Sequence, residues 1–278
     1  FKIKQNNIFN LSKWKKTYQF LKEKIKLNLF YLRKSFSSSY YFINPYKLNF
    51  FHRRRIKNER IKNLRFSYEV NQCKPDLSKK YVYFALHCEP ERTTNPDGGM
   101  FQDQIIALTN LRKILPEDIN IIVKEHPSQF ILKKGLLGRS PLFYELVNNI
   151  NSTYIVNTSL DNYQLINNSD FISTISGTIA REAAIMGKKS LIFGDSWFNN
   201  CPNVISWRED LTYQEIKNLK LNESKKVQDF LNISFEKYSV LGCQNGMGQK
   251  IFKNYIDSNF KANELEGMIY LMKEFFKN

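Results

Sequence analysis

Between Lys80 and Phe193 the chain alternates short apolar, β-rich runs with stretches of helical periodicity, and this alternation limits the possible folds more than any other feature. Strands that alternate with helices form βαβ units, in which the strands lie parallel in one sheet and the crossovers are right-handed. The runs expected to form strands are Tyr81–Leu86, Ile119–Val123, Thr153–Val156, Asp170–Ile175 and Ser190–Phe193. The stretches expected to form helices are Phe101–Leu115, Pro141–Asn149, Asp161–Asn168, Thr178–Met186 (closed by Gly187) and the chain beyond Leu211. We therefore predict an α/β fold with a Rossmann-like parallel sheet flanked by helices.

The composition excludes several other classes of protein. With 278 residues, 42% of them hydrophobic, the chain is long enough for one large domain or two small ones. It has no run of about 18 uncharged apolar residues, so we expect no transmembrane helix. Its N-terminus is charged throughout and lacks the apolar core of a secretory signal. The four scattered cysteines form no CxxC pair, so we expect reduced thiols in a cytoplasmic protein rather than a disulfide framework or a zinc site.

The chain has a formal net charge of +16, and all of this charge comes from its N-terminal part. Residues 1–66 contain 18 of the 42 Lys and Arg and two of the 26 acids, and the remaining 24 bases and 24 acids cancel. Aromatic residues are interleaved with these bases, and we expect a helix over Leu11–Lys34 that ends before Ser35–Ser39 and Pro45. We therefore predict a basic, aromatic-rich helical extension and linker over residues 1–79, followed by a Rossmann-like domain with C-terminal helices over residues 80–278.

Three interpretations of residues 1–66 stay open. A basic, aromatic-rich helix can lie on an anionic membrane surface, which for a cytoplasmic protein is the inner face of the cell membrane. It can equally be a solvated extension whose aromatic side chains pack on the main domain. Binding to nucleic acid is the least favoured of the three.

The segment Ser176-Gly177-Thr178 joins a predicted strand to a predicted helix. Gly177 allows a tight turn and a close backbone approach, and hydroxyls and amides at the start of a helix suit a phosphate. Glu182 lies four residues after Thr178, on the same helix face, where its carboxylate can accept hydrogen bonds from ribose hydroxyls. The structural alternative is a Ser or Thr N-cap with an acid in the first turn. Because ligands bind beyond the carboxyl ends of parallel strands, a nucleotide site is our leading hypothesis.

A second polar segment, Lys124-Glu125-His126-Pro127, follows another predicted strand. An imidazole can donate to a phosphate or act as an acid or base near neutral pH. Pro127 restricts His126 to an extended backbone, which aims the side chain out of the strand end. Of the three histidines in the chain, His87 and His126 both follow strands at the same predicted edge. We therefore favour a functional His126 over an ordinary loop histidine.

The loop after the first predicted strand reads His87-Cys88-Glu89-Pro90-Glu91-Arg92-Thr93-Thr94. It brings a histidine, two carboxylates and hydroxyls to the carboxyl edge of the sheet. That set suits a nucleophile or general base with ligands for sugar hydroxyls. The alternative is a solvated acidic loop, although a histidine and a cysteine directly beside the strand argue against full solvation.

Three segments together resemble the bacterial capsule polysaccharide biosynthesis family, which includes β-Kdo transferases with a GT-B-like fold. They are L-H-C-E-P-E-R-T-T…D-G-G-x-F-x-D-Q, then V-K-E-H-P-S-Q, then S-T-I-S-G-T-I-A-R-E-A-A-I-M-G-K-K-S-L-I-F-G, and they match in order and spacing over roughly residues 80–210. The resemblance implies the nucleotide-binding half of a GT-B-like glycosyltransferase. It also implies sugar transfer from a nucleotide sugar, such as CMP-Kdo, to a capsule or other surface polysaccharide or its lipid-linked primer.

The resemblance also implies roles for individual residues. Nucleotide and donor binding falls to Lys124, His126, Pro127, Ser176, Gly177, Thr178 and Glu182. The carboxylate that attacks the sugar is best matched by Glu91 and next by Glu89, with His87 and His126 as further catalytic residues. The family pattern has Gln and Asp four residues apart, where this chain has His87 and Glu91. That departure leaves the nucleophile and the donor sugar open.

We expect neither a metal nor a cofactor, because no acidic pair has a clear cation-binding spacing. GT-B transferases have two lobes, and residues 1–66 are too short and too helical to form a second doubly wound domain. We therefore expect a C-terminal part of a longer protein or a degenerate member, inactive alone if a lobe is missing. Two alternatives are a nucleotide-sugar epimerase, which would share the sheet and the phosphate turn, and a non-catalytic membrane-surface binding protein that relies on the N-terminal charge.

Overall fold

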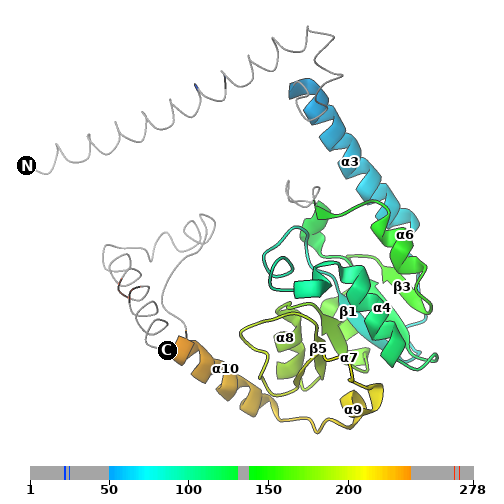
Figure 1. Cartoon of the computed structure of the whole chain (residues 1–278). Coiled ribbons are helices and arrows are strands. Elements are labelled where there is room, and N and C mark those ends of the chain that lie inside the picture. The colour runs from blue at the N-terminus through cyan, green and yellow to red at the C-terminus, as the bar shows by residue number, and fades with distance from the viewer. Residues whose placement is uncertain are drawn as a thin grey trace, which may run out of the picture.

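A computed structural model of the chain describes residues 50–130 and 138–238, together with the isolated positions 22, 25, 266 and 269. The described residues form a six-stranded parallel sheet with the order β3-β2-β1-β4-β5-β6 (Figure 1). The strands are β1 (Tyr81–Ala85), β2 (Asn120–Lys124), β3 (Thr153–Val156), β4 (Ile172–Thr174), β5 (Ser190–Ile192) and β6 (Val204–Ser206). The predicted α/β fold with a Rossmann-like parallel sheet is confirmed.

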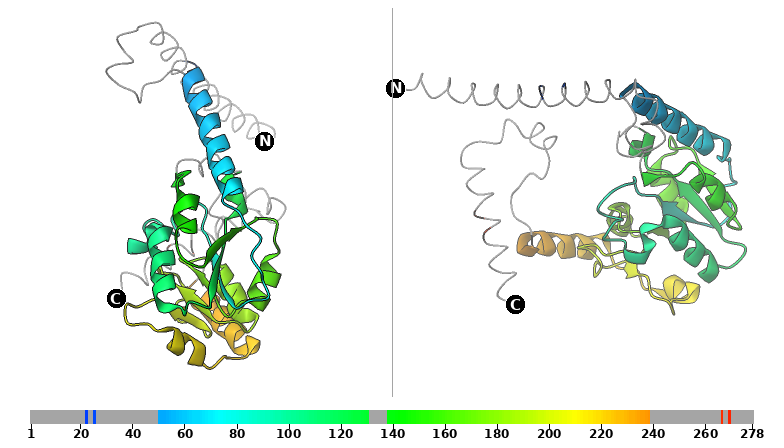
Figure 2. Two further views of the ribbon diagram at one scale, coloured as in Figure 1. Left: turned by 90° about the vertical axis from the view of Figure 1, so that its right-hand side faces the viewer. Right: turned by 45° about the horizontal axis from the view of Figure 1, so that its top comes forward.

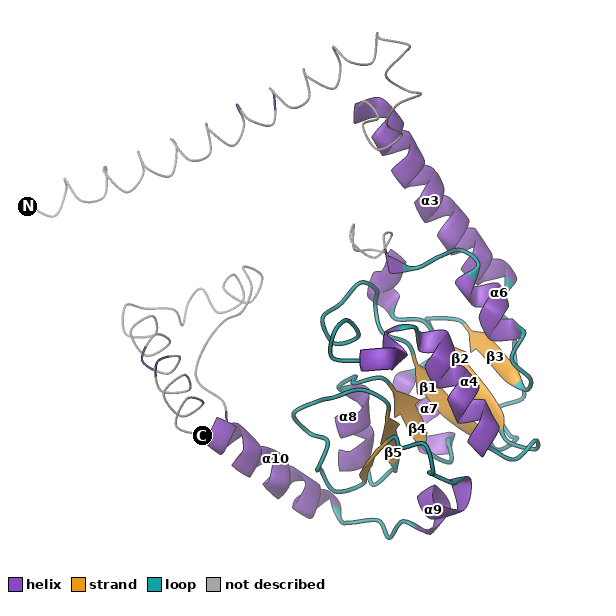
Figure 3. Cartoon of the chain, in the orientation of Figure 1, coloured by secondary structure: helices purple, strands orange, loops and turns teal. Residues whose placement is uncertain are grey.

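Helices cover both faces of this sheet (Figure 3). The α-helices described are α3 (Phe50–Val70), α4 (Gln104–Ile114), α6 (Phe143–Asn148), α7 (Asn162–Asn168), α8 (Ile179–Ile185), α9 (Tyr213–Asn218) and α10 (Ser224–Tyr238). Two short 3-10 helices, η2 (Gly99–Gln102) and η3 (Pro127–Phe130), follow β1 and β2.

Strand β1 shows how the two layers are built. Successive side chains of a strand point to opposite faces of the sheet. Val82 and Phe84 are buried against the cluster that contains α4 and α6, whereas Tyr81 and Tyr83 are buried against α7, α8 and α10. A strand that is buried on both faces is apolar along its whole length, which makes it visible in the sequence.

Helix α3 falls within the predicted extension, yet its last turns pack on the domain. Leu64 and Tyr68 are buried in the core, and the Tyr68 hydroxyl donates to the carbonyl of Val156 at 2.6 Å. The first turns of α3 project beyond the domain (Figure 2). The helix predicted over Leu11–Lys34 lies outside the described residues except at positions 22 and 25, and the domain boundary at residue 80 stays a prediction. None of the described helices is long and apolar enough to cross a membrane.

Three details differ from the sequence prediction. The stretch predicted as one helix from Phe101 is divided at Asp103, because Asp103 is extended and its side chain caps α4 by accepting from the Ile105 N–H at 3.0 Å. Strand β6 was not predicted, because three partly exposed residues form no apolar run. Beyond Leu211 the chain is not continuously helical, since residues 219–223 separate α9 from α10. Residues from 239 onward lie outside the described part, except 266 and 269.

Candidate functional site

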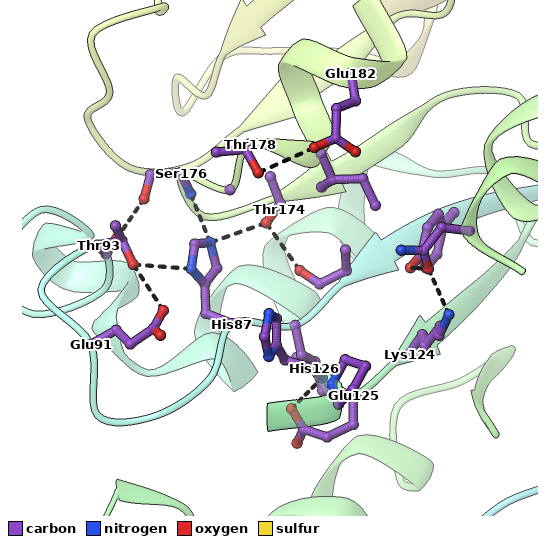
Figure 4. A pocket seen from close by; sticks show the side chains of 17 residues that line it. His87, Glu91, Thr93, Lys124, Glu125, His126, Thr174, Ser176, Thr178 and Glu182 are labelled. Carbon is purple, nitrogen blue, oxygen red and sulfur yellow. Dashed lines mark hydrogen bonds between the residues drawn. The ribbon is translucent and has the colours of Figure 1, made fainter. Parts of the chain in front are cut away.

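The order of the strands leaves a crevice next to β1. The chain runs outward from β1 through β2 to β3 and then returns to β4 on the other side of β1. Open α/β sheets bind ligands where the strand order reverses in this way, at the carboxyl ends of the strands. A pocket of about 350 Å³ lies there, lined mainly by residues just past β1, β2 and β4 (Figure 4).

The pocket brings together all the predicted site residues except Glu89. Those that line it are His87, Glu91, Lys124, His126, Pro127, Ser176, Gly177, Thr178 and Glu182. They come from segments that are far apart in the sequence, and the parallel strands bring them to one edge of the sheet.

Glu89 faces away from this pocket, into a second hollow that Asp103 and Arg139 also line. Its buried carboxylate accepts from Gln104 Nε2 at 2.8 Å and from the Thr94 hydroxyl at 3.0 Å. Burial raises the pKa of Glu89. Glu89 therefore lies outside the pocket that the other predicted residues line, where its carboxylate is bound by the loop and α4, and its role as an attacking carboxylate stays a prediction.

His87 is buried, and both of its ring nitrogens have partners. Nε2 accepts from the Ser176 N–H at 3.1 Å, and Nδ1 lies 3.2 Å from Thr93 Oγ1. Burial lowers the pKa of His87 to about 4, with further lowering by His126 and Arg139. The ring is therefore neutral at pH 7, and because Nε2 accepts, Nδ1 carries the hydrogen. Both ring nitrogens are thus engaged within the protein, and the catalytic role of His87 stays a prediction.

His126 is held differently. It is exposed at the pocket rim, and Nδ1 of its ring accepts from the Ser128 N–H at 3.2 Å. Because Nδ1 accepts, the neutral ring carries its hydrogen on Nε2. The backbone N–H of His126 donates to Glu125 Oε1 at 2.8 Å. This arrangement presents an N–H donor at the pocket, which suits an anionic oxygen.

Lys124 contributes a positive charge to the same wall. Its ammonium donates to Asn162 Oδ1 at 2.6 Å and to the carbonyl of Leu160. The hydroxyl of Tyr83 donates to the same Asn162 oxygen at 3.1 Å. An ammonium has three N–H groups, so within the described residues one remains for a ligand. Burial lowers the pKa of Lys124.

The turn between β4 and α8 is attached to the loop after β1. Besides the Ser176 N–H bond to His87, the Ser176 hydroxyl donates to the carbonyl of Thr93. A Cβ at Gly177 would lie only 2.9 Å from Thr174 Oγ1 and 3.3 Å from His87 Nε2, so the close packing of this turn requires glycine. Thr178 makes no capping bond with its side chain, and its hydroxyl donates to Glu182 Oε1 at 3.4 Å. Thr178 is thus the N-cap residue of α8 by position, with Glu182 in the first turn, but its side chain does not cap the helix.

Sequence reasoning missed a buried ion pair between Glu125, just past β2, and Arg139, which precedes α6. Glu125 and Arg139 are 1% and 6% exposed, and Arg139 Nε lies 3.1 Å from Glu125 Oε2. Arg139 also donates to the carbonyl of His87 at 2.7 Å. Tyr144 donates to Glu125 Oε2 at 2.7 Å, and burial together with the nearby Glu125 raises the pKa of Tyr144. The signal in the sequence was the acid between Lys124 and His126.

Two buried side-chain amides, also missed, hold the loop after β1. Gln104 accepts from the His87 N–H at 3.0 Å and donates to the His87 carbonyl at 3.4 Å. Gln129 accepts from the Glu89 N–H at 2.6 Å and donates to the Glu89 carbonyl at 3.1 Å. Each amide pairs with the loop backbone as a neighbouring strand would, so the loop keeps a defined path beyond the edge of the sheet.

Within residues 50–130 and 138–238, no group of three or more His, Cys, Asp or Glu side chains is arranged to hold a metal ion. Cys73, Cys88 and Cys201 are free thiols.

No protein-family profile matches this chain, and no curated protein matches its sequence. Among solved structures it is similar to the beta Kdo 2,7 transferase KpsC of Thermosulfurimonas dismutans, with 18% identity and a TM-score of 0.38 over 62% of this chain and 51% of that one. It is similar to the UDP-GlcNAc 2-epimerase of Methanocaldococcus jannaschii, with 16% identity and a TM-score of 0.38 over 62% and 49% of the two chains. It is also similar to S. aureus MnaA in complex with UDP, with 14% identity and a TM-score of 0.36 over 63% and 48%.

The chain spans about half the length of each of these three structures. Similarities this distant carry no argument about activity, and the fold is established from the chain's own strand order.

Proposed function

We propose that this pocket binds a nucleotide sugar and that the chain is the donor-binding half of a glycosyltransferase. One observation carries the proposal: two donors to anionic oxygens, Lys124 and His126, and two carboxylates, Glu91 and Glu182, line one pocket beside β1 and β4. Phosphate requires the first pair, and ribose and sugar hydroxyls are matched by the second. The crevice at this point of an open α/β sheet is where nucleotides bind.

In the proposed complex the phosphate lies between the β2 end and the β4–α8 turn. His126 donates to it from Nε2, and Lys124 supplies its remaining N–H and its charge. Glu182 accepts from the ribose hydroxyls, beside the hydroxyl of Thr178. Donors that are already in place when the phosphate departs stabilise the charge that develops there, which is usually the largest contribution to catalysis.

Glu91 has one of two roles in this reaction. As a nucleophile, its carboxylate forms a bond to the anomeric carbon while the bond from that carbon to the phosphate oxygen breaks, and the acceptor hydroxyl then displaces Glu91 and gives its proton to water. As a base, it takes the proton of the acceptor hydroxyl while the acceptor oxygen bonds to the anomeric carbon and the bond from that carbon to the phosphate oxygen breaks. The first route retains the anomeric configuration and the second inverts it, so the anomer of the product identifies the role.

The sequence resemblance makes CMP-Kdo the first donor to test, and a surface polysaccharide or its lipid-linked primer the first acceptor. We further propose that residues 1–66 hold the chain at an anionic membrane surface. Vesicle co-sedimentation should then rise with the fraction of anionic lipid and fall with salt. Binding that ignores both variables would contradict this part.

A thermal-shift panel with CMP, UDP and GDP tests the binding proposal. A nucleotide at a hundred times its dissociation constant stabilises the folded chain by about 2.7 kcal/mol. We expect one nucleotide to raise the melting temperature of the wild type and of Lys113→Ala, which changes an exposed side chain on α4. The same nucleotide should raise that of His126→Ala much less. No shift with any nucleotide, or equal shifts in all three proteins, would contradict the proposal.

Product analysis with a labelled donor separates transfer from epimerisation. A transferase moves the labelled sugar onto the acceptor, and we expect that result. An epimerase instead releases free or epimerised sugar without any acceptor.

A further inference from the structure

A chain of hydrogen bonds runs from the β4–α8 turn to Glu91, and its direction follows from the Ser176 N–H at its start (Figure 4). The Ser176 N–H can only donate, so His87 Nε2 accepts. The neutral His87 ring then carries its hydrogen on Nδ1 and donates to Thr93 Oγ1 at 3.2 Å. The Thr93 hydroxyl, having accepted from His87, directs its own hydrogen to Glu91 Oε2 at 3.4 Å.

We propose that Thr93 is a positioning residue that acts through Glu91: its hydroxyl, oriented by the neutral ring of His87, holds the Glu91 carboxylate in the orientation that the transfer reaction uses. This inference rests on the proposed function, in which Glu91 contacts the donor or the acceptor. Glu91 itself is exposed on the loop, so its carboxylate needs a partner to restrict its rotamers.

The burial of His87 is what makes the arrangement stable. A ring that protonated near neutral pH would lose the ability to accept from the Ser176 N–H, because both nitrogens of an imidazolium are donors. His87 is only 7% exposed and stays neutral, so Thr93 always faces a donor at Nδ1. The hydroxyl of Thr93 is therefore left with one hydrogen to give, and Glu91 is within reach of it.

Other bonds hold this part of the loop, so the Thr93 hydroxyl can be removed without releasing the backbone. The carbonyl of Thr93 accepts from Ser176, and the hydroxyl of Thr94 donates to the Glu91 carbonyl at 2.9 Å and to Glu89 Oε2 at 3.0 Å. Thr93→Val has nearly the same shape and leaves each of these bonds in place. It removes the two contacts of the Thr93 hydroxyl, the one to Glu91 Oε2 and the one from His87 Nδ1.

A double-mutant cycle on the full chain tests the coupling. We expect Thr93→Val to lower turnover about tenfold to a hundredfold, because misplacement of a reacting group has an effect of that order. Nucleotide affinity should change by less than about twofold. Thr93→Ser should restore turnover, and Thr93→Val should have no further effect in a Glu91→Gln background. An equal loss in both backgrounds would overturn the proposal.

Thr109→Val is the matched control, since Thr109 lies on α4 and its hydroxyl donates within that helix to the Ile105 carbonyl at 2.8 Å. If Glu91→Gln is as active as the wild type, the proposed function of Glu91 fails. If Glu91→Gln is impaired and Thr93→Val is not, only the present inference fails.

A second measurement needs no turnover. The carboxyl carbon resonance of Glu91, assigned by its loss in Glu91→Gln, should move in Thr93→Val and stay in place in Thr109→Val. An unchanged Glu91 resonance in Thr93→Val would overturn the proposal even in a chain without activity.

Discussion

His87 and His126 follow adjacent parallel strands and line the same pocket, yet the protein holds them in opposite ways. His87 is 7% exposed and has partners on both ring nitrogens, whereas His126 is exposed and presents Nε2–H at the pocket. The position after a strand brings each histidine to the pocket, and the burial of the ring then determines whether the ring can contact a ligand. A buried ring becomes part of the support, and an exposed ring can contact a ligand.

The largest effect is expected at the ion pair between Glu125 and Arg139, which links the residue before His126 to the carbonyl of His87. Arg139→Met should lower the free energy of unfolding by about 3–5 kcal/mol, because it leaves Glu125 as a buried carboxylate without its counter-charge. Chemical denaturation measures this difference.

Arg208→Met is the control for that experiment, since Arg208 pairs with Asp210 and Glu215 at the surface, with 47% of its side chain exposed. It should cost about 1 kcal/mol or less. Equal losses in the two variants would mean that the buried ion pair contributes no more to stability than the exposed one.

The next effect is a pH dependence of stability that comes from His87. The folded pKa of His87, about 4, lies below the ordinary value of 6.5, so the unfolded chain takes up the proton first as the pH falls. The stability contributed by the neutral ring is thus fully present above about pH 6.5 and is lost as the pH falls toward 4.

Between pH 7 and pH 5 the wild type should therefore lose about 2 kcal/mol more than His87→Gln, whose amide oxygen can still accept from the Ser176 N–H. Urea denaturation at the two pH values gives the comparison. Parallel losses in the two proteins would show that His87 titrates normally.

The smallest effect on stability is expected at His126. His126→Ala changes an exposed side chain, so the free energy of unfolding should stay within about 0.5 kcal/mol of the wild type. Its nucleotide-induced thermal shift should nevertheless be reduced. A large loss of stability in this variant would remove the contrast between the two histidines.

The fold could be predicted because the strands are buried on both faces. Val82 and Tyr83 point to opposite faces of the sheet and are both buried, so β1 is a continuous apolar run that stands out in the sequence without any knowledge of its neighbours. Strand β6 could not be found in this way, since its register comes from pairing with β5 rather than from its own side chains.

For the site, the sequence predicts which segments lie together, but not where each side chain in those segments points. Strand ends at one edge of a sheet converge, which brought His126 and Ser176 to the same pocket. The direction of a side chain within a loop depends on partners that are distant in the sequence. Glu89 and Glu91 are two residues apart and face different hollows because Gln104 and Thr94 hold the first. Nothing in the local pattern encodes those partners.

The amides of Gln104 and Gln129 lie outside the loop whose backbone they hold, so the path of that loop is specified by residues elsewhere in the chain. Glu91, which is exposed and lines the pocket, therefore lies on a backbone whose course does not depend on its own side chain. The side chain at this point of the pocket rim can be exchanged for another one while the surrounding loop keeps its course.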